Sequence, residues 1–198
     1  MLKDKPLESL TFGKNFNFPI VILSSLTHLT SLVFGDEFDR DIRALGKLKL
    51  LQRLTFGENF NRDISVLGKL CSLQHLTFGK TFNRSIHALG KLTSLQRLTF
   101  GDRFNQKIDV LAKSNNLTEL VFGYDFNQSI DVLKALDNLT SLTLGNNFSQ
   151  NVVITSPSFE FLILKQFPDR AEKTVRNVRR PYIFEIIRYD IEQDVIDD

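Results

Sequence analysis

The spacing of the glycines is the feature that most constrains the fold of this chain. Seven of them are 22 residues apart, and three others share the same interval in a second register. All ten glycines therefore lie in two columns, Gly13, Gly35, Gly57, Gly79, Gly101, Gly123, Gly145 and Gly46, Gly68, Gly90. Self-similarity at this period indicates a stacked array in which each unit contacts its neighbours.

One turn of the array contains a short strand. Leu76-Thr77-Phe78 alternates apolar and polar residues, as a half-buried strand does. Stacked turns place such strands side by side in a parallel sheet. The glycine after each strand marks a position that needs either a positive φ or a close approach of the backbone. The equivalent apolar pairs are Leu10/Phe12, Leu32/Phe34, Leu54/Phe56, Leu98/Phe100, Leu120/Phe122 and Leu142/Leu144.

The second half of the turn carries apolar residues at intervals of three. Ile86, Leu89 and Leu92 have the spacing of a 3₁₀ or short α-helical arc, in which residues i and i+3 share a face. The predicted fold is a repeat solenoid with a parallel β-sheet on one face and short 3₁₀ or α arcs on the other. Residues 1–155 form about seven turns, and residues 156–198 form a degenerate last turn and a C-terminal cap.

A second aromatic column runs beside a polar one. The polar column predicts a buried ladder whose side chains satisfy backbone groups where the chain bends from strand to arc. An alternative role for these side chains is contact with a ligand. The aromatic members are Phe16, Phe38, Phe60, Phe82, Phe104, Phe126 and Phe148, and the polar members are Asn17, Asp39, Asn61, Asn83, Asn105, Asn127 and Ser149.

The repeated string Leu-Thr-Phe-Gly-x-x-Phe-Asn-x-x-Ile-x-x-Leu-x-x-Leu resembles the FNIP repeat, a 22-residue relative of the leucine-rich repeat. Phe16-Asn17-Phe18-Pro19-Ile20 carries the Phe-Asn-x-Pro-Ile core of that repeat most literally, and the resemblance covers roughly residues 7–154. Later copies keep the apolar frame and replace the proline by Asp41, Asp63, Ser85, Lys107 and Ser129.

FNIP proteins are known mainly from social amoebae and from giant viruses of amoebae, and many carry an F-box before the repeats. The resemblance implies a leucine-rich-repeat-like solenoid for protein recognition, in an adaptor or substrate-recognition role linked to ubiquitin pathways. The repeats begin close to Met1, so no F-box is expected in this chain. If the protein is viral, it is expected in the host cytoplasm.

Composition excludes several other classes. A hydrophobic fraction of 42% and a charged fraction of 24% are typical of a globular chain, and a net charge of +2 does not by itself indicate a polyanionic partner. Cys71 is the single cysteine, so the chain forms no internal disulfide. No apolar run reaches the length of a membrane span, and no secretory signal is recognisable, which predicts a cytoplasmic protein.

No motif for catalysis, cofactor binding or metal binding is recognisable. The chain lacks a Walker loop, a Gly-x-Gly-x-x-Gly opening and a Cys-x-x-Cys pair. Cys71 and His75 lie four residues apart, but their columns are otherwise filled by unrelated residues, Lys49, Thr93, Arg53 and Arg97. We therefore predict no enzyme, no cofactor and no metal.

The outward face of the strands is the candidate binding face. Along the sheet, the Thr/Val column through Thr77 is regular, whereas the column through His75 varies in charge. Arg is favoured at interfaces for its fixed set of donors. We predict that Arg53, His75, Arg97 and Glu119 bind an acidic or polar protein surface; the alternative is a solvated face.

Two basic columns lie elsewhere, Arg40, Arg62, Arg84 and Lys47, Lys69, Lys91, Lys113. Their simplest role is solubility, with Lys favoured at the C-terminal end of each arc. The alternative is contact with nucleic acid phosphates, but interspersed Asp residues and the near-neutral total charge argue against a nucleic acid partner.

The C-terminal region departs from the repeat. Phe159-x-x-Leu162-x-Leu164 repeats the strand pattern at a spacing of 20 and predicts a last strand. Pro181 can open a helix with Phe184, Ile187, Ile191 and Val195 on one face. Such a helix would cap the stack or serve as a partner or self-association element. The alternative function is therefore a structural homo-oligomer joined through the solenoid ends.

Overall fold

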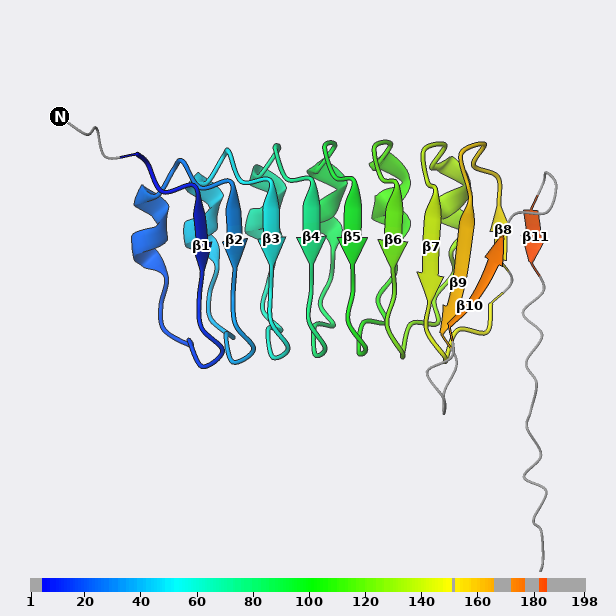
Figure 1. Ribbon diagram of the computed structural model, residues 1–198, viewed down its shortest axis with the longest axis horizontal. Helices are drawn as coiled ribbons and strands as arrows, with labels where there is room; N and C mark the ends of the chain where they lie inside the picture. Colours follow the sequence, from blue (N-terminus) through cyan, green and yellow to red (C-terminus); the bar gives the residue numbers. More distant parts are fainter. Residues whose placement is uncertain (1–4, 151, 166–171, 177–181, 185–198) are drawn as a thin grey trace, which may run out of the picture.

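A computed structural model describes residues 5–150, 152–165, 172–176 and 182–184. The chain winds into a stack of turns, with strands on one face and short helices on the other (Figure 1). The strands that follow one another in parallel are β1 (Ser9–Thr11), β2 (Ser31–Val33), β3 (Arg53–Thr55), β4 (His75–Thr77), β5 (Arg97–Thr99), β6 (Glu119–Val121), β7 (Ser141–Leu144) and β9 (Phe161–Lys165).

The 22-residue period fixes the register of this sheet. Leu76 of β4 lies between Leu54 of β3 and Leu98 of β5, so each residue pairs with its own equivalent in the neighbouring turn. The parallel sheet predicted from the alternation of Leu76-Thr77-Phe78 is confirmed.

The arcs are 3₁₀ helices, and the described residues contain no α-helix. The Leu89 N–H donates to the Ile86 carbonyl at 2.9 Å, and the Leu92 N–H donates to the Leu89 carbonyl at 2.9 Å. The apolar spacing of three therefore coincides with the i to i+3 hydrogen bonds of a 3₁₀ turn. The helices are η1 (Val21–Ser25), η2 (Arg43–Lys47), η3 (Ser65–Lys69), η4 (His87–Lys91), η5 (Asp109–Lys113) and η6 (Asp131–Ala135).

The core between sheet and arcs contains two ladders of phenylalanine rings. Within one turn, the centroids of Phe78 and Phe82 are 3.9 Å apart with nearly parallel planes. Between turns, Phe56 and Phe78 are 5.6 Å apart, and Phe60 and Phe82 are 6.2 Å apart. Phe82 has no exposed surface, so its column belongs to the core.

The glycine after each strand is required by close packing of successive turns. A Cβ atom on Gly57 would overlap the carbonyl group of Gly35 and lie 2.6 Å from the Cα atom of Asp36. None of the ten glycines has a left-handed φ. Of the two reasons that the sequence offers for this column, the close approach of the backbone is correct.

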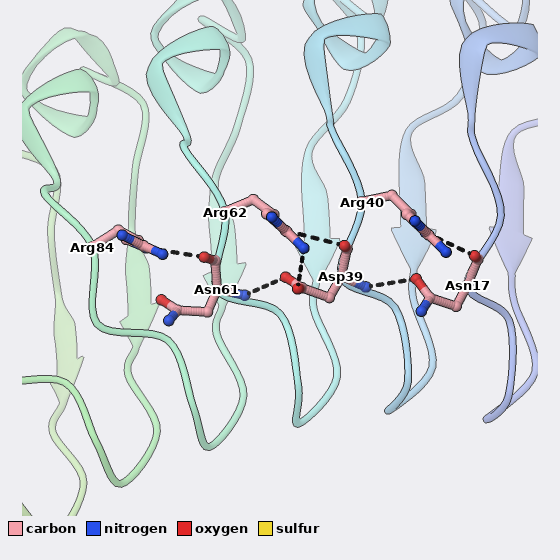
Figure 2. Close-up of polar contacts among 6 residues, drawn as sticks. All are labelled: Asn17, Asp39, Arg40, Asn61, Arg62 and Arg84. Carbon is pink, nitrogen blue, oxygen red and sulfur yellow. Dashed lines mark hydrogen bonds and ion pairs between the residues drawn. The ribbon is translucent and has the colours of Figure 1, made fainter.

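The predicted polar ladder is present. The side-chain oxygen of Asn17 accepts the Asp39 N–H at 3.1 Å, and the carboxylate of Asp39 accepts the Asn61 N–H at 3.0 Å (Figure 2). The same bond recurs in every turn up to the Ser149 N–H. The ladder is half-buried or exposed, however, and its expected burial is wrong. The side chains bind backbone groups along the outer surface of the bend rather than inside it.

The basic column beside the ladder also has a structural role. The Nε atoms of Arg40, Arg62 and Arg84 donate to the carbonyls of Asn17, Asp39 and Asn61 at 3.0 to 3.1 Å (Figure 2). In the next turn the equivalent position is Gln106, whose side-chain amide donates to the Asn83 side chain at 2.8 Å. Solubility is therefore not the main reason for this column, because each arginine links two successive turns.

Asn105→Ala tests the contribution of the ladder to stability. The Oδ1 atom of Asn105 accepts both the Asn127 N–H at 3.0 Å and the Gln128 side-chain amide at 2.9 Å. We expect the variant to lose about 1 kcal/mol of unfolding free energy in urea denaturation, because the site is only half-buried. Asn105→Asp keeps the acceptor oxygen and is expected to retain most of this stability; equal losses in both variants would contradict the role.

The C-terminal end of the stack is closed by strands. β9 continues the parallel sheet next to β7, with Leu142 opposite Leu162, which confirms the predicted last strand. β10 (Glu172–Arg176) runs antiparallel to β9, and β8 (Val152–Ile154) occupies the place of a seventh arc and pairs with β11 (Tyr182–Phe184). The predicted helix after Pro181 is wrong for residues 182–184, and Ile187, Ile191 and Val195 lie outside the described residues.

Candidate protein-binding face

The sheet places the four predicted binding residues in one row on adjacent strands. Arg53 of β3 pairs with His75 of β4, His75 pairs with Arg97 of β5, and Arg97 pairs with Glu119 of β6. We call Arg53, His75, Arg97 and Glu119 the strip. The 22-residue period alone brings these residues together, because equivalent positions in successive turns are direct neighbours in the sheet.

The strip consists of an open basic part and an ion pair. The Nε atom of Arg97 lies 3.3 Å from an oxygen of Glu119, and the two side chains are 61% and 43% exposed. The positive charge of Arg97 is therefore partly balanced, which the sequence analysis did not foresee. Arg53 is exposed and forms no ion pair with the part of the chain described. An exposed pair of this kind contributes only about 0–1 kcal/mol to stability and so can rearrange when a partner binds.

His75 lies half-buried between the two arginines. Burial of the imidazole lowers its pKa below 6.5, and the charges of Arg97 and Arg53 lower the pKa further, whereas Glu119 opposes them. The ring is therefore neutral at physiological pH and adds a hydrogen-bonding group, rather than a third cation, to the strip.

The pKa of His75 makes stability depend on pH. Because the folded-state pKa is depressed, the unfolded chain binds more protons just below pH 6.5. The neutral ring therefore contributes to the free energy of unfolding above pH 6.5, and this contribution is lost as the pH falls toward the folded-state pKa. We expect the urea midpoint of the native chain to fall on acidification relative to that of His75→Gln. A constant difference between the two midpoints would contradict the shift.

Tyr124 belongs to the same face but is missed by the sequence analysis. It borders a small hollow of about 200 Å³ at the ends of β5 and β6, lined by Thr99 and Val121 of the outward Thr/Val column. Tyr124 is 38% exposed, whereas the equivalent positions in other turns are filled by Lys14, Asp36, Glu58, Lys80, Asp102 and Asn146. The aromatic exception in a polar column is the signal that could have identified it. Tyrosine beside a hollow is a frequent anchor in interfaces.

The other residues weighed for chemistry are not brought into a site. Cys71 is exposed, and no group of three or more His, Cys, Asp or Glu side chains suited to a metal ion occurs among the described residues. Within the same residues, no helix is long and apolar enough to cross a membrane. The four exposed lysines of the arc column, Lys47, Lys69, Lys91 and Lys113, lie on the helical side, away from the strip.

No family model and no curated protein sequence matches the chain. Among solved structures, it is similar to a circular leucine-rich-repeat protein of a giant virus, CroV588, with 33% identity and a TM-score of 0.57 over 79% of this chain and 27% of that one. It is also similar to the Leptospira interrogans leucine-rich-repeat protein LIC12759, with 22% identity and a TM-score of 0.64 over 72% of this chain and 38% of the other.

A third similar structure is that of Toll in complex with Spatzle, from Drosophila. It shares 15% identity and a TM-score of 0.56 over 81% of this chain and 21% of the other. The chain thus spans between about a fifth and two fifths of the length of these proteins. At such identities the likeness concerns the fold, and membership of the FNIP family is not confirmed. The chain has the leucine-rich-repeat fold.

Proposed function

We propose that this chain is a protein-recognition module and that it binds its partner through the outward face of the parallel sheet. One observation carries the proposal: four neighbouring strands present a varied row of charged and polar side chains, Arg53, His75, Arg97 and Glu119, beside an otherwise regular Thr/Val column. A row that served only solubility or strand stability would not need to change its charge from turn to turn.

The chemistry of the strip favours a partner with an acidic or polar surface. Arg53 offers a guanidinium that forms no ion pair with the described residues, and Arg97 can exchange Glu119 for a carboxylate of the partner. Tyr124 and its hollow lie close by and suit an apolar side chain of the same partner. The complex of Toll with Spatzle is an example of this fold used in protein recognition. A link to ubiquitin pathways remains a prediction of the family resemblance.

A pull-down with charge-reversed variants tests the proposal. Tagged native chain and Arg53→Glu/Arg97→Glu are incubated with cytosol of an amoebal host type, and captured proteins are identified by mass spectrometry. We expect a partner that the native chain captures and the double variant loses, because two of the donors then repel an acidic surface. Capture of the same proteins by both forms would contradict the use of the strip.

Lys47→Glu/Lys91→Glu is the matched control. It changes the net charge by the same amount, but its exposed side chains lie at the ends of η2 and η4, on the helical side of the stack. We expect this variant to capture the partner as the native chain does. Loss of the partner in both double variants would indicate a general effect of charge rather than recognition by the strip.

A further inference from the structure

The first turn of the solenoid has an open apolar side. Phe18, Val21 and Ile22 are 66%, 75% and 74% exposed, and they include the most exposed large apolar side chains of the described residues. Single exposed apolar residues are common on proteins, but here three of them lie within five residues of one turn. We call Phe18, Val21 and Ile22 the terminal patch.

Two members of the terminal patch are departures from the repeat. The position of Phe18 is filled in the other turns by Arg40, Arg62, Arg84, Gln106, Gln128 and Gln150, and that of Val21 by Arg43, Ser65, His87, Asp109 and Asp131. Both positions are polar in every later turn that has a 3₁₀ arc, whereas Val153, the next equivalent of Val21, lies in β8 at the opposite end. Large apolar residues at both positions together therefore occur only in the first turn.

The third member lies at a position that contacts the preceding turn elsewhere in the stack. Val66 is the equivalent of Ile22, and it packs closely against Gly46 of the preceding turn. A Cβ atom added to Gly46 would lie 2.7 Å from the Cγ2 atom of Val66. Ile22 has no described turn before it and is left exposed. The rings of Phe12 and Phe16, which begin the two aromatic ladders, are likewise only half-buried.

The same turn carries little charge, and Lys14, which pairs with Asp36, lies just before a long stretch without any. Residues 15–35 contain no Asp, Glu, Lys or Arg, whereas residues 37–57 contain eight. A surface that binds a different protein can use complementary charges, but a surface that meets its own copy about a two-fold axis brings like charges together. An apolar turn with little charge is therefore well suited to self-association.

The free edge of the sheet lies at the same end. β1 pairs with β2 on one side, and no strand of the described residues pairs with its other side, so its backbone can pair with a further strand. At the opposite end of the stack, β10 pairs antiparallel with β9, so a further parallel strand cannot be added next to β9 there. Two identical β1 edges related by a two-fold axis can pair antiparallel, which brings the two first turns, each with its terminal patch, to one interface.

We propose that two copies of this chain form a dimer through their first turns, with the β1 edges side by side and the terminal patches buried between the copies. The dimer leaves the strip of both copies on the outer face of one continued sheet. It is independent of the proposed function, since the strip lies on β3 to β6.

Sedimentation velocity of the native chain and of Phe18→Arg/Val21→Asp tests the dimer. The two substitutions give the first turn the residues that Arg40 and Asp109 supply in other turns, and they change exposed side chains only. We expect the native chain to shift from monomer to dimer as its concentration rises through the micromolar range, and the double variant to dimerise about tenfold more weakly or not at all. Circular dichroism checks that the variant is folded.

Leu50→Asp is the control, because Leu50 is 51% exposed outside the terminal patch and its substitution should leave dimerisation unchanged. A native chain that stays monomeric at every concentration would overturn the proposal. This outcome is also the one expected if the terminal patch binds a different protein instead of a second copy. Dimerisation of the double variant at native strength would overturn it as well. Ile22→Ala, which only shortens a side chain, should weaken the dimer in the same direction.

Discussion

Replacing Phe82 by alanine should lower the free energy of unfolding by about 3–5 kcal/mol, because a large buried ring is removed and the stack cannot close the cavity. The ring of Phe82 lies 3.9 Å from that of Phe78 and about 6 Å from the rings of Phe60 and Phe104 in the turns on either side. The substitution therefore interrupts the ladder of Phe60, Phe82 and Phe104 at the centre of the solenoid and leaves Phe78 of the other ladder without its neighbour in the same turn. Urea denaturation followed by circular dichroism measures the loss.

Phe18→Ala is the matched control for this substitution. The same ring is removed, but Phe18 is 66% exposed and belongs to neither ladder. We expect a change well below 1 kcal/mol for folded monomer, as for other exposed positions. Similar losses in Phe82→Ala and Phe18→Ala would contradict the assignment of the two aromatic columns to the core.

Gly57→Ala should be destabilising by about 3 kcal/mol, at the upper end of what overpacking costs. Its methyl group would overlap the carbonyl of Gly35, which belongs to the backbone and cannot move aside without separating two turns of the sheet. The comparison is Gly13→Ala in the same column, where an added Cβ atom meets nothing within 4 Å. We expect Gly13→Ala to unfold close to the native midpoint; equal effects of the two substitutions would contradict close packing as the reason for the column.

Most of the fold follows from periods in the sequence. The alternation in Leu76-Thr77-Phe78 and the spacing of Ile86, Leu89 and Leu92 each correspond to one type of hydrogen bonding, so they predict strands and arcs directly. The C-terminal region was harder to predict because it has no repeat to compare. The sequence of residues 182–184 is compatible with a helix or a strand. These residues form a strand because they pair with β8.

That the four residues of the strip are neighbours could be predicted from the sequence, but their side-chain contacts could not. A repeat of 22 residues makes Arg53, His75, Arg97 and Glu119 neighbours, and no other information is needed for that. The ion pair between Arg97 and Glu119 depends on side-chain conformations that no spacing encodes. For the same reason, the sequence did not distinguish the arginines at 40, 62 and 84, which bind backbone carbonyls, from cations facing solvent.

The most direct test of recognition through the sheet is photo-crosslinking from the two faces of the stack. A photoreactive phenylalanine analogue replaces Thr77, which lies two residues from His75 on the same face of β4, or Lys91 at the end of η4. Recognition through the sheet predicts a crosslink from position 77 to the protein that the native chain captures, and none from position 91. A crosslink to that protein from position 91 and none from position 77 would contradict it.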